Sequence, residues 1–183
     1  MTRHLLLMRH AKSDWHDSSL ADKDRPLNAR GRATAPTVAN WLVIHDRLPD
    51  LVLCSSAIRT QQTLELMMEH WTALRSSIPK LLLPCVHVED RLYLASDTTI
   101  LSIAIDASCV DESARCVMVL GHNPGMEALA SKLNGTPVSM PTGAIAILAS
   151  DSNEEAWPVD WRNDKMWKWG GLVKPRELGS EAI

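Results

Sequence analysis

Short apolar runs alternate along the chain with stretches in which apolar residues recur at helical spacing. The apolar runs, which have the length of buried strands, are residues 4–9, 51–54, 81–88, 116–120 and 144–148, with 172–173 as a last short addition. The helical stretches begin at about residue 28, after residue 56, at about 97 and at 124. Strands that alternate with helices predict an α/β layer fold.

Prolines and serines indicate where these helices begin or break. Pro36 lies inside the helix expected from about residue 28, where a missing amide proton and crowding of the preceding turn predict a kink or a restart. Ser55 or Ser56 can cap the helix after the second strand. Pro124 is favourable in the first turn of a helix, where its missing N–H costs nothing.

Arginines and histidines follow three of the apolar runs. Arg9 and His10 end the first, Arg59 follows the second in Ser-Ser-Ala-Ile-Arg-Thr, and His122 follows the run at 116–120 in Gly-His-Asn-Pro-Gly. Open α/β sheets bind ligands beyond the carboxyl ends of their strands, so we expect these three ends to converge on one anion. The polar stretch 14–25 has neither helical nor strand periodicity, so it predicts an exposed loop near the end of the first strand. Functional residues are often found in such loops.

These residue types suit phosphoryl chemistry. Imidazole has an ordinary pKa of about 6.5, so a large neutral fraction of His10 can attack phosphorus at neutral pH, and adjacent cations favour that form. The guanidinium forks of Arg9 and Arg59 can each donate two parallel hydrogen bonds to phosphoryl oxygens. The alternatives are a core histidine satisfied by hydrogen bonds and arginines in surface salt bridges, but three matching strand ends favour the site.

The motifs resemble those of the histidine phosphatase (phosphoglycerate mutase-like) superfamily. Arg-His-Ala-Lys-Ser at 9–13, Asp-Arg-Pro-Leu at 24–27 with Gly31, and Gly-His-Asn-Pro-Gly at 121–125 are similar to the small SixA-type phosphohistidine phosphatases. In the mutases, by contrast, the first motif usually reads Arg-His-Gly. The motifs lie within roughly residues 4 to 130, and the C-terminal third matches only loosely.

The resemblance implies a fold and a set of catalytic roles. The fold is a three-layer α/β/α sandwich with a mostly parallel central sheet. His10 would be the nucleophile, forming a covalent phospho-His10 intermediate, while Arg9 and Arg59 bind the phosphoryl group and His122 contacts it and stabilises the transition state. The reaction would need neither a metal nor an organic cofactor.

Four further residues are candidates for substrate binding. Lys12 and Ser13 can donate to the phosphate or contact an acidic protein, and Trp15 can wall the mouth of the site. Lys12 is equally compatible with a solvent-exposed side chain. Asn123 is a candidate for substrate binding or for capping the following helix, and Asp24 with Arg25 is expected to form a local structural pair.

The proton donor is the least clear part of the site. Larger family members place a Glu or Asp after the third strand, where this chain has Glu89 and Asp90, although an acidic turn paired with Arg91 is an equal alternative. Resemblance to the SixA branch implies that no dedicated acid is needed. A sugar alkoxide benefits from general acid catalysis, whereas a phosphorylated imidazole can be protonated on its other nitrogen and leave as a neutral amine.

Hydrolysis of phosphohistidine on a protein, such as a phosphotransfer domain, is therefore the favoured function. One alternative is a small-molecule phosphomonoesterase that uses Glu89 or Asp90 as the general acid. The other is a non-catalytic module that binds phosphorylated ligands, which would need the arginines but not an intact His10.

Bulk properties exclude several other classes. The length of 183 residues predicts one domain spanning 1–183, and a net charge of -3 gives no footprint for nucleic acid or an anionic membrane. The scattered cysteines predict neither a metal site nor disulfides, and without a transmembrane or signal segment we expect a cytoplasmic protein. A cluster of tryptophans is expected to cover a sheet edge, namely Trp157, Trp161, Trp167 and Trp169.

Overall fold

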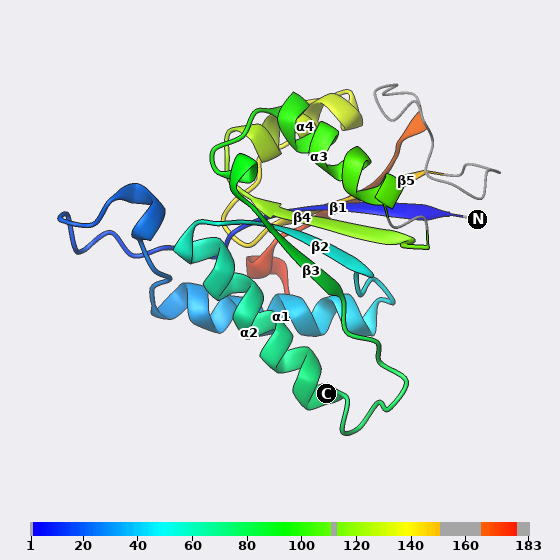
Figure 1. Ribbon diagram of the computed structural model, residues 1–183, viewed down its shortest axis with the longest axis horizontal. Coiled ribbons are helices and arrows are strands. Elements are labelled where there is room, and N and C mark those ends of the chain that lie inside the picture. Colours follow the sequence, from blue (N-terminus) through cyan, green and yellow to red (C-terminus); the bar gives the residue numbers. More distant parts are fainter. Residues whose placement is uncertain (1, 111–112, 151–165, 179–183) are drawn as a thin grey trace.

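A six-stranded sheet forms the centre of the computed structural model, which describes residues 2–110, 113–150 and 166–178 (Figure 1). The strands are β1 (Arg3–Arg9), β2 (Leu51–Ser55), β3 (Cys85–Glu89), β4 (Cys116–Gly121), β5 (Ile145–Ser150) and β6 (Lys168–Val173). Their order in the sheet is β3-β2-β4-β1-β5-β6. Among these described strands, β5 alone runs in the opposite direction to the others, which confirms the mostly parallel sheet.

Helices cover both faces of the sheet. The helices are α1 (Ala29–Ile44), α2 (Ile58–Leu74), α3 (Asp97–Val110) and α4 (Gly125–Asn134). Figure 1 shows α1 and α2 on one face and α3 and α4 on the other, so the three-layer α/β/α sandwich is confirmed. None of the described helices is long and apolar enough to cross a membrane.

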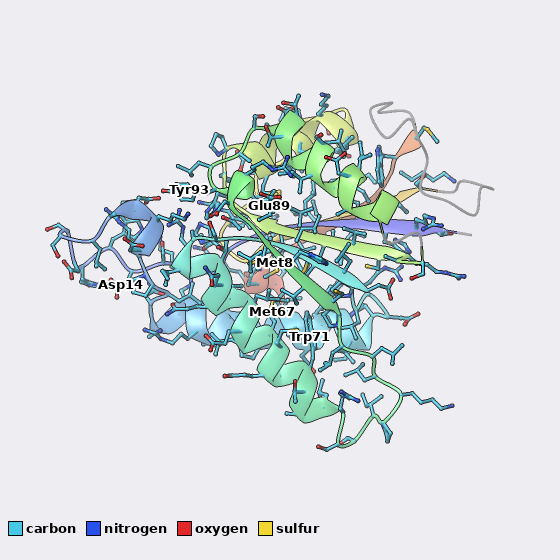
Figure 2. All side chains as sticks on the ribbon, in the orientation of Figure 1. Met8, Asp14, Met67, Trp71, Glu89 and Tyr93 are labelled. Atoms are coloured by element: carbon cyan, nitrogen blue, oxygen red, sulfur yellow. The ribbon has the colours of Figure 1, made fainter. Side chains whose placement is uncertain are left out.

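Alternation along the central strand β1 divides the core into two apolar clusters. Leu5 and Leu7 pack with the layer of α3 and α4, whereas Leu6 and Met8 pack with α1 and α2, because successive strand side chains point to opposite faces. Trp71 of α2, which is completely buried, fills the second cluster (Figure 2), and its indole N–H donates to the Ala39 carbonyl at 3.0 Å. A strand buried on both faces explains the unbroken apolar run at the start of the chain.

One expectation about helix boundaries is wrong, and another is decided only in part. Helix α1 continues through Pro36 without a restart, because its buried stripe, which includes Ala35 and Val38, packs on the core at both sides of the proline, and a kink at Pro36 stays a prediction. Helix α2 has Ala57 as its N-cap and no side-chain cap, because the Ser55 and Ser56 hydroxyls bind other partners described below.

Other bounds differ by a few residues. Strand β3 begins at Cys85 rather than at 81, directly after Pro84, and β6 is longer than residues 172–173. Trp167 is buried in the cluster beneath α3 and α4, and Trp169 packs against this cluster, whereas the covering of a sheet edge by the tryptophans stays a prediction. Trp157 and Trp161 lie outside the described residues.

Candidate active site

A cavity of about 240 Å³ opens at the edge of the sheet where the parallel strands end. Strand β1 ends at Arg9 opposite Gly121 of β4, and Cys54 of β2 pairs with Leu120, so the segments after these strands meet at one place. Apart from the two candidate general acids, all of the residues predicted for catalysis or substrate binding line it: Arg9, His10, Lys12, Ser13, Trp15, Arg59, His122 and Asn123. Asp22, Leu94 and Thr142 complete the lining.

His10 is buried and has a defined tautomer. Its Nδ1 lies 2.7 Å from the Ala11 carbonyl oxygen, and since a carbonyl can only accept a hydrogen bond, Nδ1 carries the proton. The Nε2 lone pair is then unprotonated and accepts from Nε of Arg59 at 3.3 Å. Burial, with the positive charges of Arg59 and Arg9, lowers the pKa of His10 to about 4. The ring is therefore neutral at pH 7, with a lone pair at Nε2.

Arg59 lies in the first turn of α2 and is held by the loop between β1 and α1. Its Nη1 donates to the main-chain oxygen of Asp22 at 2.5 Å, and Nη2 donates to Asp22 Oδ2 at 2.9 Å. A cation at a helix N-terminus opposes the macrodipole, so these acceptors and a bound anion both stabilise this position. Nε of Arg59 is then directed at His10, where it could donate a hydrogen bond to a phosphoryl oxygen.

Arg9 approaches the cavity from the end of β1. Its Nη1 donates to the Met140 carbonyl at 2.8 Å, while Nε has no partner among the described residues. Burial lowers the pKa of the Arg9 guanidinium, the nearby charge of Arg59 lowers it further, and Glu127 acts in the opposite direction. Two guanidinium groups that repel each other beside an imidazole lone pair favour a dianion.

His122 follows β4 directly and faces His10. Its Nε2 lies 2.8 Å from the Ser55 hydroxyl, and Nδ1 is buried without a partner in the described part of the chain. The two imidazole centroids are 5.1 Å apart. Burial, followed by the charges of His10 and Arg59, lowers the pKa of His122 to about 3. Asn123 does not cap α4, since its amide donates to Glu127 and to a main-chain carbonyl instead.

Asp22 is the carboxylate that the sequence analysis did not identify. Its Oδ2 accepts from Arg59 and, at 2.8 Å, from the Tyr93 hydroxyl. Partial burial acts to raise the pKa of Asp22, but the bond from Tyr93 and the charge of Arg59 outweigh it and hold the pKa below its usual value. The expected pairing of Asp24 with Arg25 is wrong, because Arg25 Nε lies 3.9 Å from Asp22 Oδ1.

Neither candidate general acid lines the cavity. Glu89 accepts from Arg91 Nη2 at 2.9 Å, as the alternative of an acidic turn anticipated. Asp90 accepts from Lys23 Nζ at 3.0 Å and from the Ser56 hydroxyl. Hydrogen bonds from these partners lower the pKa of both carboxyl groups. Figure 2 shows Glu89 and Tyr93 at the same end of the sheet, but only Tyr93 contacts the Asp22 carboxylate.

The remaining candidate residues lie at the mouth of the cavity. Lys12 is exposed, whereas Ser13 is buried and its hydroxyl accepts from the Trp15 indole N–H at 3.1 Å. Trp15 itself is 63% exposed, with the Arg25 guanidinium 3.8 Å from its ring centroid. Within the ranges that the structure describes, no three His, Cys, Asp or Glu residues are grouped to hold a metal ion.

Comparison with known proteins places the chain in a family. The model of the histidine phosphatase superfamily (branch 1) matches residues 5–81. An uncharacterized chloroplastic protein of Arabidopsis thaliana is 35% identical over 183 residues, which cover 96% of this chain and 79% of that protein. The chain belongs to the histidine phosphatase superfamily. The protein is therefore a phosphatase, and the recognition made from the motifs is confirmed.

Solved structures agree with this assignment. A structure from Agrobacterium tumefaciens, described as the phosphohistidine phosphatase SixA, is 28% identical, covers 94% of this chain and 99% of its own, and superposes with a TM-score of 0.70. A tungstate complex of the protein histidine phosphatase SixA has a TM-score of 0.73 at 23% identity, covering 96% of this chain and 99% of that one, and so supports the fold alone. The cytoplasmic location stays a prediction, and the Arabidopsis relative is described as chloroplastic.

Proposed function

We propose that this histidine phosphatase hydrolyses phosphohistidine on a protein, with His10 as the nucleophile. The observation that carries the proposal is the state of the carboxylates. Asp22, the one carboxylate among the described lining residues, is ionised and already accepts from Arg59 and Tyr93. Glu89 and Asp90 are bound to cations away from the cavity. Such a site favours a substrate whose leaving group is already protonated and needs no general acid.

In the first step, Nε2 of His10 attacks the phosphorus atom. The bond from phosphorus to the substrate imidazole breaks, and its electron pair stays on the substrate nitrogen. Because the other nitrogen of that ring is protonated, the leaving group is a neutral imidazole. Arg9 and Arg59 balance the charge on the phosphoryl oxygens, and the buried Nδ1 of His122 is suited to bind one of them when protonated.

The product of that step is His10 phosphorylated at Nε2. Its Nδ1–H remains bonded to the Ala11 carbonyl, which stabilises the positive charge that the ring acquires. Water then attacks phosphorus, the bond to Nε2 breaks, and the electron pair returns to His10 as inorganic phosphate forms. The water oxygen becomes the fourth phosphate oxygen, and its two protons stay on the phosphate as H₂PO₄⁻ or one of them passes to solvent.

The neighbour from Agrobacterium tumefaciens supports a phosphohistidine substrate, since it is named as a phosphohistidine phosphatase. The test is phosphate release from a phosphohistidine-bearing phosphotransfer domain and from glucose 6-phosphate, with chelator present. We expect selective hydrolysis of the phosphotransfer domain, its loss in His10→Asn, and turnover within about twofold of the parent in Glu89→Gln and Asp90→Asn.

Other outcomes would decide for the alternatives. Efficient turnover of glucose 6-phosphate that falls about 100-fold in Glu89→Gln or Asp90→Asn would replace the proposal with a phosphomonoesterase that uses that residue as its acid. If the parent protein binds the phosphorylated domain but releases no phosphate, and His10→Asn binds it equally well, the protein is a binding module. Quenching in alkaline detergent during turnover should trap an acid-labile, alkali-stable phosphate on the parent protein and none on His10→Asn.

A further inference from the structure

Two large apolar side chains are exposed at the mouth of the cavity. Trp15 comes from the loop between β1 and α1, and Leu94 comes from the segment between β3 and α3, with exposed fractions of 63% and 53%. Both line the same cavity as His10. Burying apolar surface is favourable, so two such side chains held in water beside one cavity indicate a surface that another molecule covers.

The backbone is strained at Leu94. Its φ is 49°, in the left-handed region that disfavours a side chain with a Cβ. The residues on either side fix the turn, because the Tyr93 hydroxyl donates to Asp22 and Ala95 is buried with its carbonyl against Gly125. A strained backbone maintained by its neighbours at a candidate active site supports a functional role for the side chain.

Trp15 is also held in position. Its indole N–H donates to the buried Ser13 hydroxyl, and the Arg25 guanidinium stacks over the ring. These contacts fix the orientation of the indole, yet most of the residue remains exposed. A rigid aromatic side chain loses little conformational entropy on binding, which is why tryptophan is common among the residues that dominate protein interfaces.

We propose that Trp15 and Leu94 form an apolar rim that binds the protein carrying the phosphorylated histidine. This inference rests on the proposed function and adds the means by which the substrate protein is recognised. The partner would present the phosphohistidine into the cavity and apolar side chains to the rim, as neighbours three or four positions away on a helix do. A free phosphorylated amino acid has no such neighbours and gains little from the rim.

The experiment compares two substrates: a phosphohistidine-bearing phosphotransfer domain and free phosphohistidine. Leu94→Gly removes the apolar side chain, and glycine adopts the same positive φ without strain, so the variant should fold with an unchanged or higher Tm. Trp15→Ala tests the other side of the rim. Leu82→Gly is the matched control, because Leu82 is 80% exposed and precedes β3, at the opposite end of that strand from the site.

For each variant the informative quantity is kcat/KM for the protein divided by kcat/KM for free phosphohistidine. We expect this ratio to fall about tenfold in Leu94→Gly and in Trp15→Ala, mainly through a higher KM for the protein, and to be unchanged in Leu82→Gly. An unchanged ratio in both rim variants would overturn the inference while leaving the proposed function intact. A parent enzyme that hydrolyses free phosphohistidine but not the protein would overturn both.

Discussion

Lowering the pH should destabilise this protein through its two buried active-site histidines. Burial and the neighbouring arginines hold the pKa of His10 at about 4, whereas an unfolded histidine has a pKa of about 6.5. Between these values the unfolded chain binds a proton that the folded protein does not. The free energy of unfolding is therefore unaffected above the unfolded pKa and falls as the pH drops from 6.5 towards 4.

The magnitude follows from the separation of the two pKa values. Each unit is worth about 1.4 kcal/mol, so His10 alone lowers the free energy of unfolding by about 2 kcal/mol at pH 5 and by about 3 kcal/mol at pH 4. His122, whose pKa is lowered to about 3, adds a similar loss by pH 5. Carboxylates with lowered pKa values add to the acid instability of the whole protein, so a variant is needed to isolate the histidine contribution.

His10→Asn provides that comparison, because the asparagine amide can still donate to the Ala11 carbonyl but does not titrate. Urea unfolding of both proteins at half-unit steps from pH 8 to pH 4.5 gives the difference in the free energy of unfolding. We expect a constant difference above pH 7 and a shift of about 2 kcal/mol in favour of the variant by pH 5. A difference that stays constant down to pH 5 would refute the lowered pKa of His10.

Three more substitutions test the geometry around the site. Gly125→Ala places a Cβ 1.9 Å from the Ala95 carbonyl oxygen, so it should lower the free energy of unfolding by about 2 kcal/mol despite the better helix propensity of alanine. Gly121→Ala, whose nearest obstacle is the flexible end of a methionine, should cost less, and urea unfolding of both checks the order. Asp22→Asn weakens the charge-assisted hydrogen bond that positions Arg59. We expect kcat to fall about tenfold, while inhibition by inorganic phosphate is not weakened. An unchanged kcat would contradict the role of Asp22 in positioning Arg59.

The positions of the cavity residues could be predicted because they depend on regular features. A parallel strand that is buried on both faces reads as an apolar run, and Arg9 with His10 follow such a run directly. The registers of β1, β2 and β4 then bring the strand ends together, as the topology of an open sheet requires. The sequence therefore predicted that Arg59 and His122 lie at the same place, without knowledge of side-chain contacts.

The features of the site that the sequence did not predict depend on the paths of irregular loops. Asp22 lies in a polar loop without periodicity, and nothing in its spacing indicates that its carboxylate, rather than that of Asp24, reaches the arginines. Ser55 and Ser56 have the composition of helix caps, but tertiary partners take their hydroxyls. Local propensity competes there with long-range hydrogen bonds, and the sequence alone does not show which one wins.

The same burial that destabilises the protein in acid supports the proposed role of His10 as a nucleophile between arginines. A protonated His10 would repel both guanidinium groups and could not attack phosphorus, so the lowered pKa keeps the reactive form present at neutral pH. Asp22 balances part of the positive charge, since its carboxylate pairs with Arg59. A phosphoryl dianion would take over that electrostatic role on binding, so the charges, the His10 tautomer and the position of the loop all favour the proposed chemistry, the transfer of a phosphoryl group to Nε2 of His10.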